Sequence, residues 1–288
     1  MMTQRPKEQQ HGYIWVNSDL QLSDPQEAIR CLSNAVEDIL ALNLPLAGIW
    51  MLGDVLCGDN LTDLLSVANK VMELLEVFPV PVCYLLGNHE MDLLRVGKPR
   101  WPLYELAVAH PQWRTLAHID DLYFSLEFFG CRVYFLSDHS APDLHWWTTH
   151  GQIMGDVAAY PYGEGEYRKL AAEVAQLAQP AILVSHYAFP GGQRPSDLLG
   201  RLRPLPSNVL FHLYGHAHIG DLRLNREYPY RRDFLIAGES IWQYNISALE
   251  DRRSAGSHSA FLEFADHRPI KLHIRCHKLR QWLEVFTL

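Results

Sequence analysis

Residues 48–54 read GIWMLGD, an apolar run that ends in a glycine followed by an aspartate. The same design occurs twice more, in YIWVNSD at 13–19 and in VPVCYLLGN at 80–88. Each segment predicts a strand that runs directly into a polar side chain. Because the apolar runs are nearly continuous rather than alternating, they indicate parallel strands buried on both faces of a sheet.

Amphipathic helices are predicted between these strands. The sequence DPQE at 24–27 combines a capping residue, a proline at the first helical position and a glutamate suited to a capping box. Apolar residues then recur at helical spacing between residues 28 and 40, and again between residues 64 and 75. This alternation of strand and helix predicts an α/β fold.

The second half of the chain carries further strand signals. A hairpin is expected within 122–138, closed around Gly130, and a helix at about 165–178. Two later segments, 181–189 and 208–218, each run from an apolar strand into a loop that bears histidine. The pattern suggests two packed sheets with helices outside them.

The C-terminal part is expected to be mostly β-structure. Its segment PIKLHIRCHK at 269–278 alternates apolar and basic residues, which predicts a solvated basic face that includes Lys271 and Arg275. We expect residues 13–288 to form one domain and residues 1–12 to form a flexible polar tail.

Composition narrows the classes of function. Lysine and arginine number 25 against 33 aspartates and glutamates, and the net charge of -8 leads us to expect no nucleic-acid partner. No stretch approaches the roughly 18 apolar residues of a membrane span. The five cysteines are scattered without CxxC spacing, and the polar N-terminus lacks the apolar core of a signal peptide. We therefore expect a cytoplasmic protein.

Five short polar motifs follow predicted strands, at the positions where α/β proteins gather ligand-binding residues. They are Asp19-Leu20-Gln21, Gly53-Asp54, Gly87-Asn88-His89-Glu90, His186, and Gly215-His216-Ala217-His218. Together they supply carboxylate, amide and imidazole groups, a mixed oxygen and nitrogen set that suits Mn, Fe or Zn better than Ca. The glycines allow tight turns that aim the side chains inward.

In this order, the motifs resemble the signature of the calcineurin-like metallophosphoesterase superfamily: D-x-H, G-D, G-N-H-[E/D], H and G-H-x-H. The resemblance covers about residues 13–220. It implies a four-layer α/β/β/α sandwich in which two mixed sheets are flanked by helices. It also implies a phosphate-ester substrate, which could be a small molecule or a phosphoprotein.

The resemblance implies two metal ions with these ligands: Asp19 and His218 for the first, Asn88, His186 and His216 for the second, and Asp54 as the bridge. It implies that a metal-bridging hydroxide attacks a phosphomonoester or phosphodiester in line. His89 would face the phosphate and assist the leaving group rather than bind metal. The expected ions are Mn, Fe or Zn.

Gln21 departs from the signature, which has histidine two residues after the first aspartate. Its amide oxygen could bind an ion directly, bind through water or not bind, and we keep it among the candidate metal ligands. A neutral amide oxygen is a poorer ligand than imidazole for a borderline metal, and this favours Mn. Gln21 is also the one sequence feature that supports an alternative function, a catalytically silent scaffold that binds other proteins.

Two nearby residues leave alternatives open. Glu90 could orient a metal ligand or cap a helix. Arg95 could bind an anionic part of the substrate, or it could belong to a solvated basic loop. Within a strand of the predicted second sheet, His212 is expected to be a core or sheet-face residue.

Overall fold

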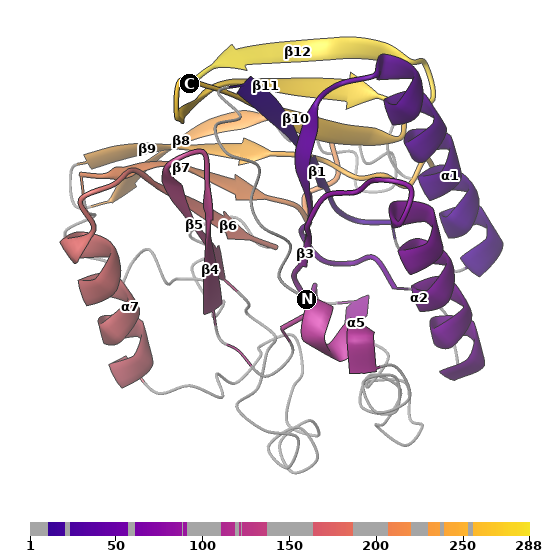
Figure 1. Ribbon diagram of the computed structural model, residues 1–288, viewed down its shortest axis with the longest axis horizontal. Coiled ribbons are helices and arrows are strands. Elements are labelled where there is room, and N and C mark those ends of the chain that lie inside the picture. Colours follow the sequence, from indigo (N-terminus) through magenta and orange to yellow (C-terminus); the bar gives the residue numbers. More distant parts are fainter. Residues whose placement is uncertain are drawn as a thin grey trace.

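The computed structural model describes residues 11–20, 24–56, 61–87, 89–90, 111–118, 121, 123–136, 164–186, 207–219, 230–236, 239–252 and 256–288. These residues form two six-stranded sheets, with helices on both outer sides (Figure 1). The predicted α/β fold with two mixed sheets is confirmed. Among the described helices, none is long and apolar enough to cross a membrane.

The first sheet contains the three strands predicted at the start of the chain. Its order is β12 (Gln281–Thr287), β11 (Arg268–Cys276), β10 (His258–Ala265), β1 (His11–Asn17), β2 (Leu46–Met51) and β3 (Val82–Tyr84). The pairs β1–β2 and β2–β3 are parallel, as their apolar sequences predict. The C-terminal strands add to β1 as an antiparallel extension.

The second sheet places the histidine-bearing segments on neighbouring strands. Its order is β4 (Tyr123–Phe128), β5 (Cys131–Leu136), β6 (Ala181–Ser185), β7 (Val209–Tyr214), β9 (Glu239–Asn245) and β8 (Arg231–Ile236). The predicted hairpin around Gly130 is confirmed as the antiparallel pair β4–β5, whereas β5, β6, β7 and β9 run parallel. His212, on β7, is fully buried, as expected.

Helices α1 (Pro25–Leu42) and α2 (Leu61–Leu75) cover the first sheet, and α7 (Glu164–Gln176) lies on the opposite side of the molecule (Figure 1). One apolar cluster fills the space between the first sheet and its helices, and a second fills the space between the two sheets. Asp24 caps α1 by accepting a hydrogen bond from the Gln26 N–H, as the sequence predicts. A short helix, α5 (Pro111–Leu116), packs near β3.

The prediction of a solvated basic face on β11 is wrong at Arg275. This residue is only 5% exposed, because α1 packs over its end of the strand. Arg275 Nε and a terminal nitrogen donate to the two oxygens of Asp38 on α1, at 2.6 and 2.7 Å. The attraction between the two charges compensates the free-energy cost of removing them from water. Lys271 remains exposed, as predicted.

Asp38 also ends a buried chain of hydrogen bonds. His277 Nδ1 lies 2.9 Å from Asp38, and His277 Nε2 lies 2.7 Å from Ser259 Oγ. This order of groups matches a catalytic triad. However, Ser259 is fully buried and accepts the indole N–H of Trp15 at 2.9 Å. We therefore infer that these hydrogen bonds hold α1 against the first sheet.

Candidate metal centre

The polar motifs lie together where the strands of both sheets end. Asp19 follows β1, Asp54 follows β2, His186 follows β6, and His216 and His218 follow β7. Because these strands are parallel within each sheet, their carboxyl ends share one edge. Backbone hydrogen bonds join neighbouring loops, such as Asp19 N–H to the Gly53 carbonyl at 3.0 Å.

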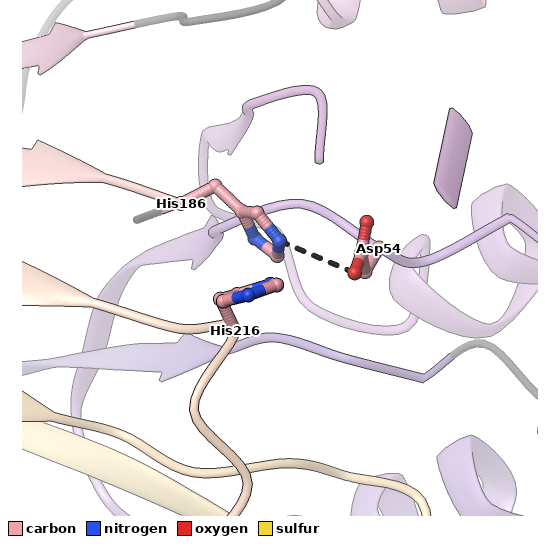
Figure 2. Close-up of side chains that lie close together, drawn as sticks. All are labelled: Asp54, His186 and His216. Atoms are coloured by element: carbon pink, nitrogen blue, oxygen red, sulfur yellow. Dashed lines mark ion pairs between the residues drawn. The ribbon is translucent and has the colours of Figure 1, made fainter. Parts of the chain in front are cut away.

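The centre of the cluster consists of Asp54, His186 and His216. One potential ligand atom from each of these residues lies within 4.8 Å of the others. Figure 2 shows the three side chains converging, with His186 Nε2 3.2 Å from Asp54 Oδ2. His186 Nδ1 donates to the Leu52 carbonyl at 2.6 Å, which leaves Nε2 directed at the cluster.

A second pair, Asp19 and His218, adjoins this cluster. His218 Nε2 lies 3.0 Å from Asp19 Oδ1, and the other oxygen of Asp19 accepts the backbone N–H of His216 at 2.7 Å. Both side chains are buried. Since the backbone of His216 contacts Asp19 while its ring faces Asp54, the two halves of the site form one continuous arrangement.

Electrostatics keep both aspartates ionised. Burial by itself favours the neutral acids, but the neighbouring histidines, His218 foremost, hold the pKa of Asp19 well below its usual range. His186 similarly lowers the pKa of Asp54. In return, and against the effect of its own burial, the charge of Asp54 raises the pKa of His186 to about 10. The negative charge of Asp19 partly opposes this decrease in the pKa of Asp54, so the ionisation of the two carboxylates is linked.

The backbone reaches this geometry through unusual conformations. Asp19, Asp54 and His216 have φ values of 55°, 55° and 60°, in the left-handed region that non-glycine residues seldom adopt. Residues held in this region cluster at functional sites, where surrounding contacts compensate the strain. Seven other described non-glycine residues share this conformation, so the site rests on the convergence of its side chains rather than on backbone strain.

Two motif glycines are required because residues of a neighbouring loop lie very close to their Cα atoms. A Cβ atom on Gly87 would lie 2.1 Å from Asp54 Oδ1, and one on Gly215 would lie 2.0 Å from Ser18 Oγ. Neither distance is sterically possible. The glycines thus let the ligand-bearing loops pack directly against one another.

Glu90 holds two of these loops together. It is fully buried and accepts hydrogen bonds from the following groups: the backbone N–H groups of Asp54, Val55, Leu56 and Gly87, at 2.6–2.9 Å, and the hydroxyl of Tyr84, at 2.8 Å. Burial, and then the charge of Asp54, raise the pKa of Glu90. Of the two roles that the sequence left open, the structure favours orientation of a candidate ligand loop.

His89 lies at the margin of the cluster. Its backbone N–H donates to Asp54 Oδ1 at 2.7 Å, and its Nε2 lies 4.0 Å from Asp54 Oδ2. The side chain is 40% exposed, whereas those of Asp54 and His186 are 1% exposed. A molecule that approaches the cluster from solvent can therefore reach the His89 ring.

Three candidate site residues, Gln21, Asn88 and Arg95, lie outside the described residues. Conversely, sequence reasoning missed Glu250, which is fully buried and contacts His218 Nδ1 at 3.0 Å. Glu250 follows β9 without a glycine or histidine motif, so its local sequence carries no signal of this role. Only the packing of its loop against that of His218 reveals it.

The residues present fit a metal centre. Ionised carboxylates and imidazoles that converge within 4.8 Å provide the donor types and the spacing that Mn, Fe and Zn require. The Nδ1 hydrogen bonds of His186 and His218 are of the kind that orients metal-binding histidines.

The sequence and the fold are similar to those of known proteins. The sequence profile of the family described as calcineurin-like phosphoesterase matches residues 14–220. A search of curated proteins found no match.

Solved structures share the fold at low sequence identity. The purple acid phosphatase PPD1 from yellow lupin seeds is 14% identical with a TM-score of 0.59, and the match covers 98% of this chain and 54% of that one. PhoD is 9% identical with a TM-score of 0.59, covering 96% and 68%. GAP50, described as the anchor in the inner membrane complex of Plasmodium, is 12% identical with a TM-score of 0.51, covering 97% and 89%. The chain thus spans about half the length of the purple acid phosphatase.

Proposed function

The chain belongs to the calcineurin-like phosphoesterase family, and on that premise we propose that it is a metal-dependent hydrolase of phosphate esters. The observation that carries this proposal is the convergence of Asp54, His186 and His216 beside the pair formed by Asp19 and His218. These residues come from loops of both sheets, and buried ionisable groups that converge at one point are typical of functional sites.

The proposed ligand set divides between two ions. Asp19 and His218 would hold the first, with Gln21 as a further candidate, Asn88, His186 and His216 would hold the second, and Asp54 would be shared by both. Ions bound there would supply the positive charge that polarises a phosphate ester and that lowers the pKa of a water molecule toward neutral pH. Mn is favoured, with Fe or Zn as alternatives, because Gln21 offers an amide in place of an imidazole.

His89 assists the departure of the leaving group. Its backbone N–H is tied to Asp54, so the residue has a fixed position beside the proposed bridging ligand. Its ring is accessible to solvent and can donate a proton to the oxygen of the departing alcohol. Arg95 is the proposed contact for an anionic part of the substrate. The substrate is a phosphomonoester or a phosphodiester, carried by a small molecule or a phosphoprotein.

The test is hydrolysis of p-nitrophenyl phosphate and of its bis ester by metal-free protein titrated with Mn. We expect Mn-dependent turnover that Asp54→Asn abolishes. Asp266→Asn is the matched control, because it makes the same chemical change at an exposed turn between β10 and β11. Absence of turnover with saturating Mn, Fe and Zn on either ester or on phosphoprotein and nucleotide substrates would refute the proposal.

The alternative function is a catalytically silent scaffold that binds other proteins. Gln21 supports it, because it replaces a residue of the family signature at the first proposed ion. Two bound ions without turnover, together with a stable partner in pull-down experiments, would favour the scaffold. Turnover that depends on Asp54 would exclude it.

A further inference from the structure

Glu250 contacts both members of the Asp19–His218 pair. Its Oε1 lies 3.0 Å from His218 Nδ1, and its backbone N–H donates to the Asp19 carbonyl at 3.2 Å. Its Oε2 accepts the backbone N–H of Arg252 at 2.9 Å. The residue is 0% exposed. A fully buried carboxylate of this kind costs free energy unless its interactions compensate the loss of hydration.

We propose that Glu250 is a positioning residue of the metal centre, which orients His218 and strengthens it as a ligand of the first ion. This inference rests on the proposed function, because it presumes that the Asp19–His218 pair binds a metal ion. It concerns how the chain builds that subsite and requires no particular substrate.

The direction of the hydrogen bond determines which nitrogen of His218 faces the ion. A carboxylate oxygen accepts and does not donate, so the proton of the His218–Glu250 bond belongs to Nδ1. Nε2 faces Asp19 Oδ1 at 3.0 Å, and the proton of that bond is the one that a bound ion would displace, because Nδ1 keeps its own proton in the bond to Glu250. Glu250 thus directs Nε2 of His218 and Oδ1 of Asp19 toward one point.

The corresponding bond at the second subsite is different. There His186 Nδ1 donates to the backbone carbonyl of Leu52, which is a neutral acceptor. A carboxylate acceptor makes the imidazole a stronger electron donor than a carbonyl does. His218 therefore has a stronger hydrogen-bond acceptor than His186 has, at the subsite where Gln21 replaces an imidazole of the family signature. Glu250 compensates for the weaker ligand by adding a negative charge and a more basic histidine.

The test measures Mn binding to the full chain, by electron paramagnetic resonance of the free ion during titration. For Glu250→Gln we expect the affinity of one of the two ions to fall roughly 10–100-fold while the other is unchanged. His218→Asn identifies the affected subsite, because it should abolish the same binding step. Glu263→Gln is the matched control: Glu263 pairs with His273 at 2.7 Å, and its partner on β1, Tyr13, lies about 20 Å along the strand from Asp19.

The tautomer of His218 gives a second measurement, which needs no Glu250 variant to fold. In wild-type protein loaded with Zn, nitrogen chemical shifts should show Nδ1 protonated and Nε2 bound to the ion. A ring that binds the ion through Nδ1 would overturn the inference. So would Glu250→Gln protein with both wild-type affinities, or with both affinities reduced equally.

Failure of this inference can be distinguished from failure of the proposed function. Two bound ions with an Nδ1-protonated His218, but no hydrolysis, would remove the function and leave the role of Glu250 intact. Hydrolysis by the wild-type protein, together with Glu250→Gln protein that keeps both ion affinities, would remove the role of Glu250 and leave the proposed function intact. A wild-type chain that binds no ion would overturn both.

Discussion

Replacement of Glu90 by glutamine should destabilise the protein by an amount that its hydrogen bonds allow us to calculate. One oxygen of Glu90 accepts two backbone donors, and the other accepts two backbone donors and the hydroxyl of Tyr84. Glutamine keeps the shape but turns one of these oxygens into an NH2 group, which cannot accept. At least two buried donors therefore lose their acceptor, whichever oxygen is replaced.

The cost follows from those lost bonds. A buried hydrogen bond to a charged group contributes about 1.5–3 kcal/mol, so two of them amount to about 3–6 kcal/mol. The neutral amide also removes the cost of burial and the repulsion from Asp54 that raise the pKa of Glu90. We therefore expect the free energy of unfolding to decrease by about 3–4 kcal/mol, near the lower end of that range.

The measurement is urea unfolding of metal-free protein, followed by circular dichroism and extrapolated to water. Because the protein is free of metal, the measurement reports the loss of the Glu90 hydrogen bonds and not a change in ion binding. Tyr84→Phe is the graded control, because it removes one donor while the carboxylate keeps four others, and we expect it to cost about 1.5 kcal/mol. The reasoning is refuted if Glu90→Gln lies within about 1 kcal/mol of wild type, or if Tyr84→Phe costs as much.

Three further outcomes are expected. His89→Ala should lower kcat roughly 10²–10⁴-fold while equilibrium dialysis still finds two bound ions; loss of an ion would make His89 a ligand instead. Arg275→Met should lower the free energy of unfolding by about 3–5 kcal/mol, because Asp38 stays buried without its guanidinium partner, whereas the exposed Lys271→Met should change it by no more than about 0.5 kcal/mol. Burial, and then the charge of His277, lower the pKa of His258 to about 4. In the unfolded chain, His258 is protonated below about pH 6.5. The stability that the folded protein gains from keeping His258 neutral and buried is therefore fully present above that pH, and about 3 kcal/mol of it is lost as the pH falls to 4. The thermal midpoint of His258→Gln should therefore decline less than that of wild type between pH 7 and 4.5, and parallel profiles would contradict this assignment.

Much of the fold was predictable because its signals are local. The runs at 13–19, 48–54 and 80–88 are nearly continuous in apolar residues before their polar ends, and strands of a sheet covered on both faces have this pattern. Asp24 and Pro25 likewise mark the start of α1 through contacts within a few residues. By contrast, Arg275 was misassigned, because the alternation in its strand does not reveal that α1 covers that face.

The sequence by itself determined which side chains end the strands and in what order, since a ligand-bearing turn is encoded by a glycine and a polar residue side by side. The metal-binding and catalytic roles of all the candidate site residues remain predictions, and Gln21, Asn88 and Arg95 lie outside the described residues. Only the tertiary structure revealed Glu90 as the clamp between the loops of Asp54 and His89, and Glu250 as the partner of His218. Glu250 lies 32 residues from His218 along the chain, and Asp38 lies 237 residues from Arg275. A buried charge is paired through space by whatever the packed loops and helices bring to it, and no local periodicity records that partner.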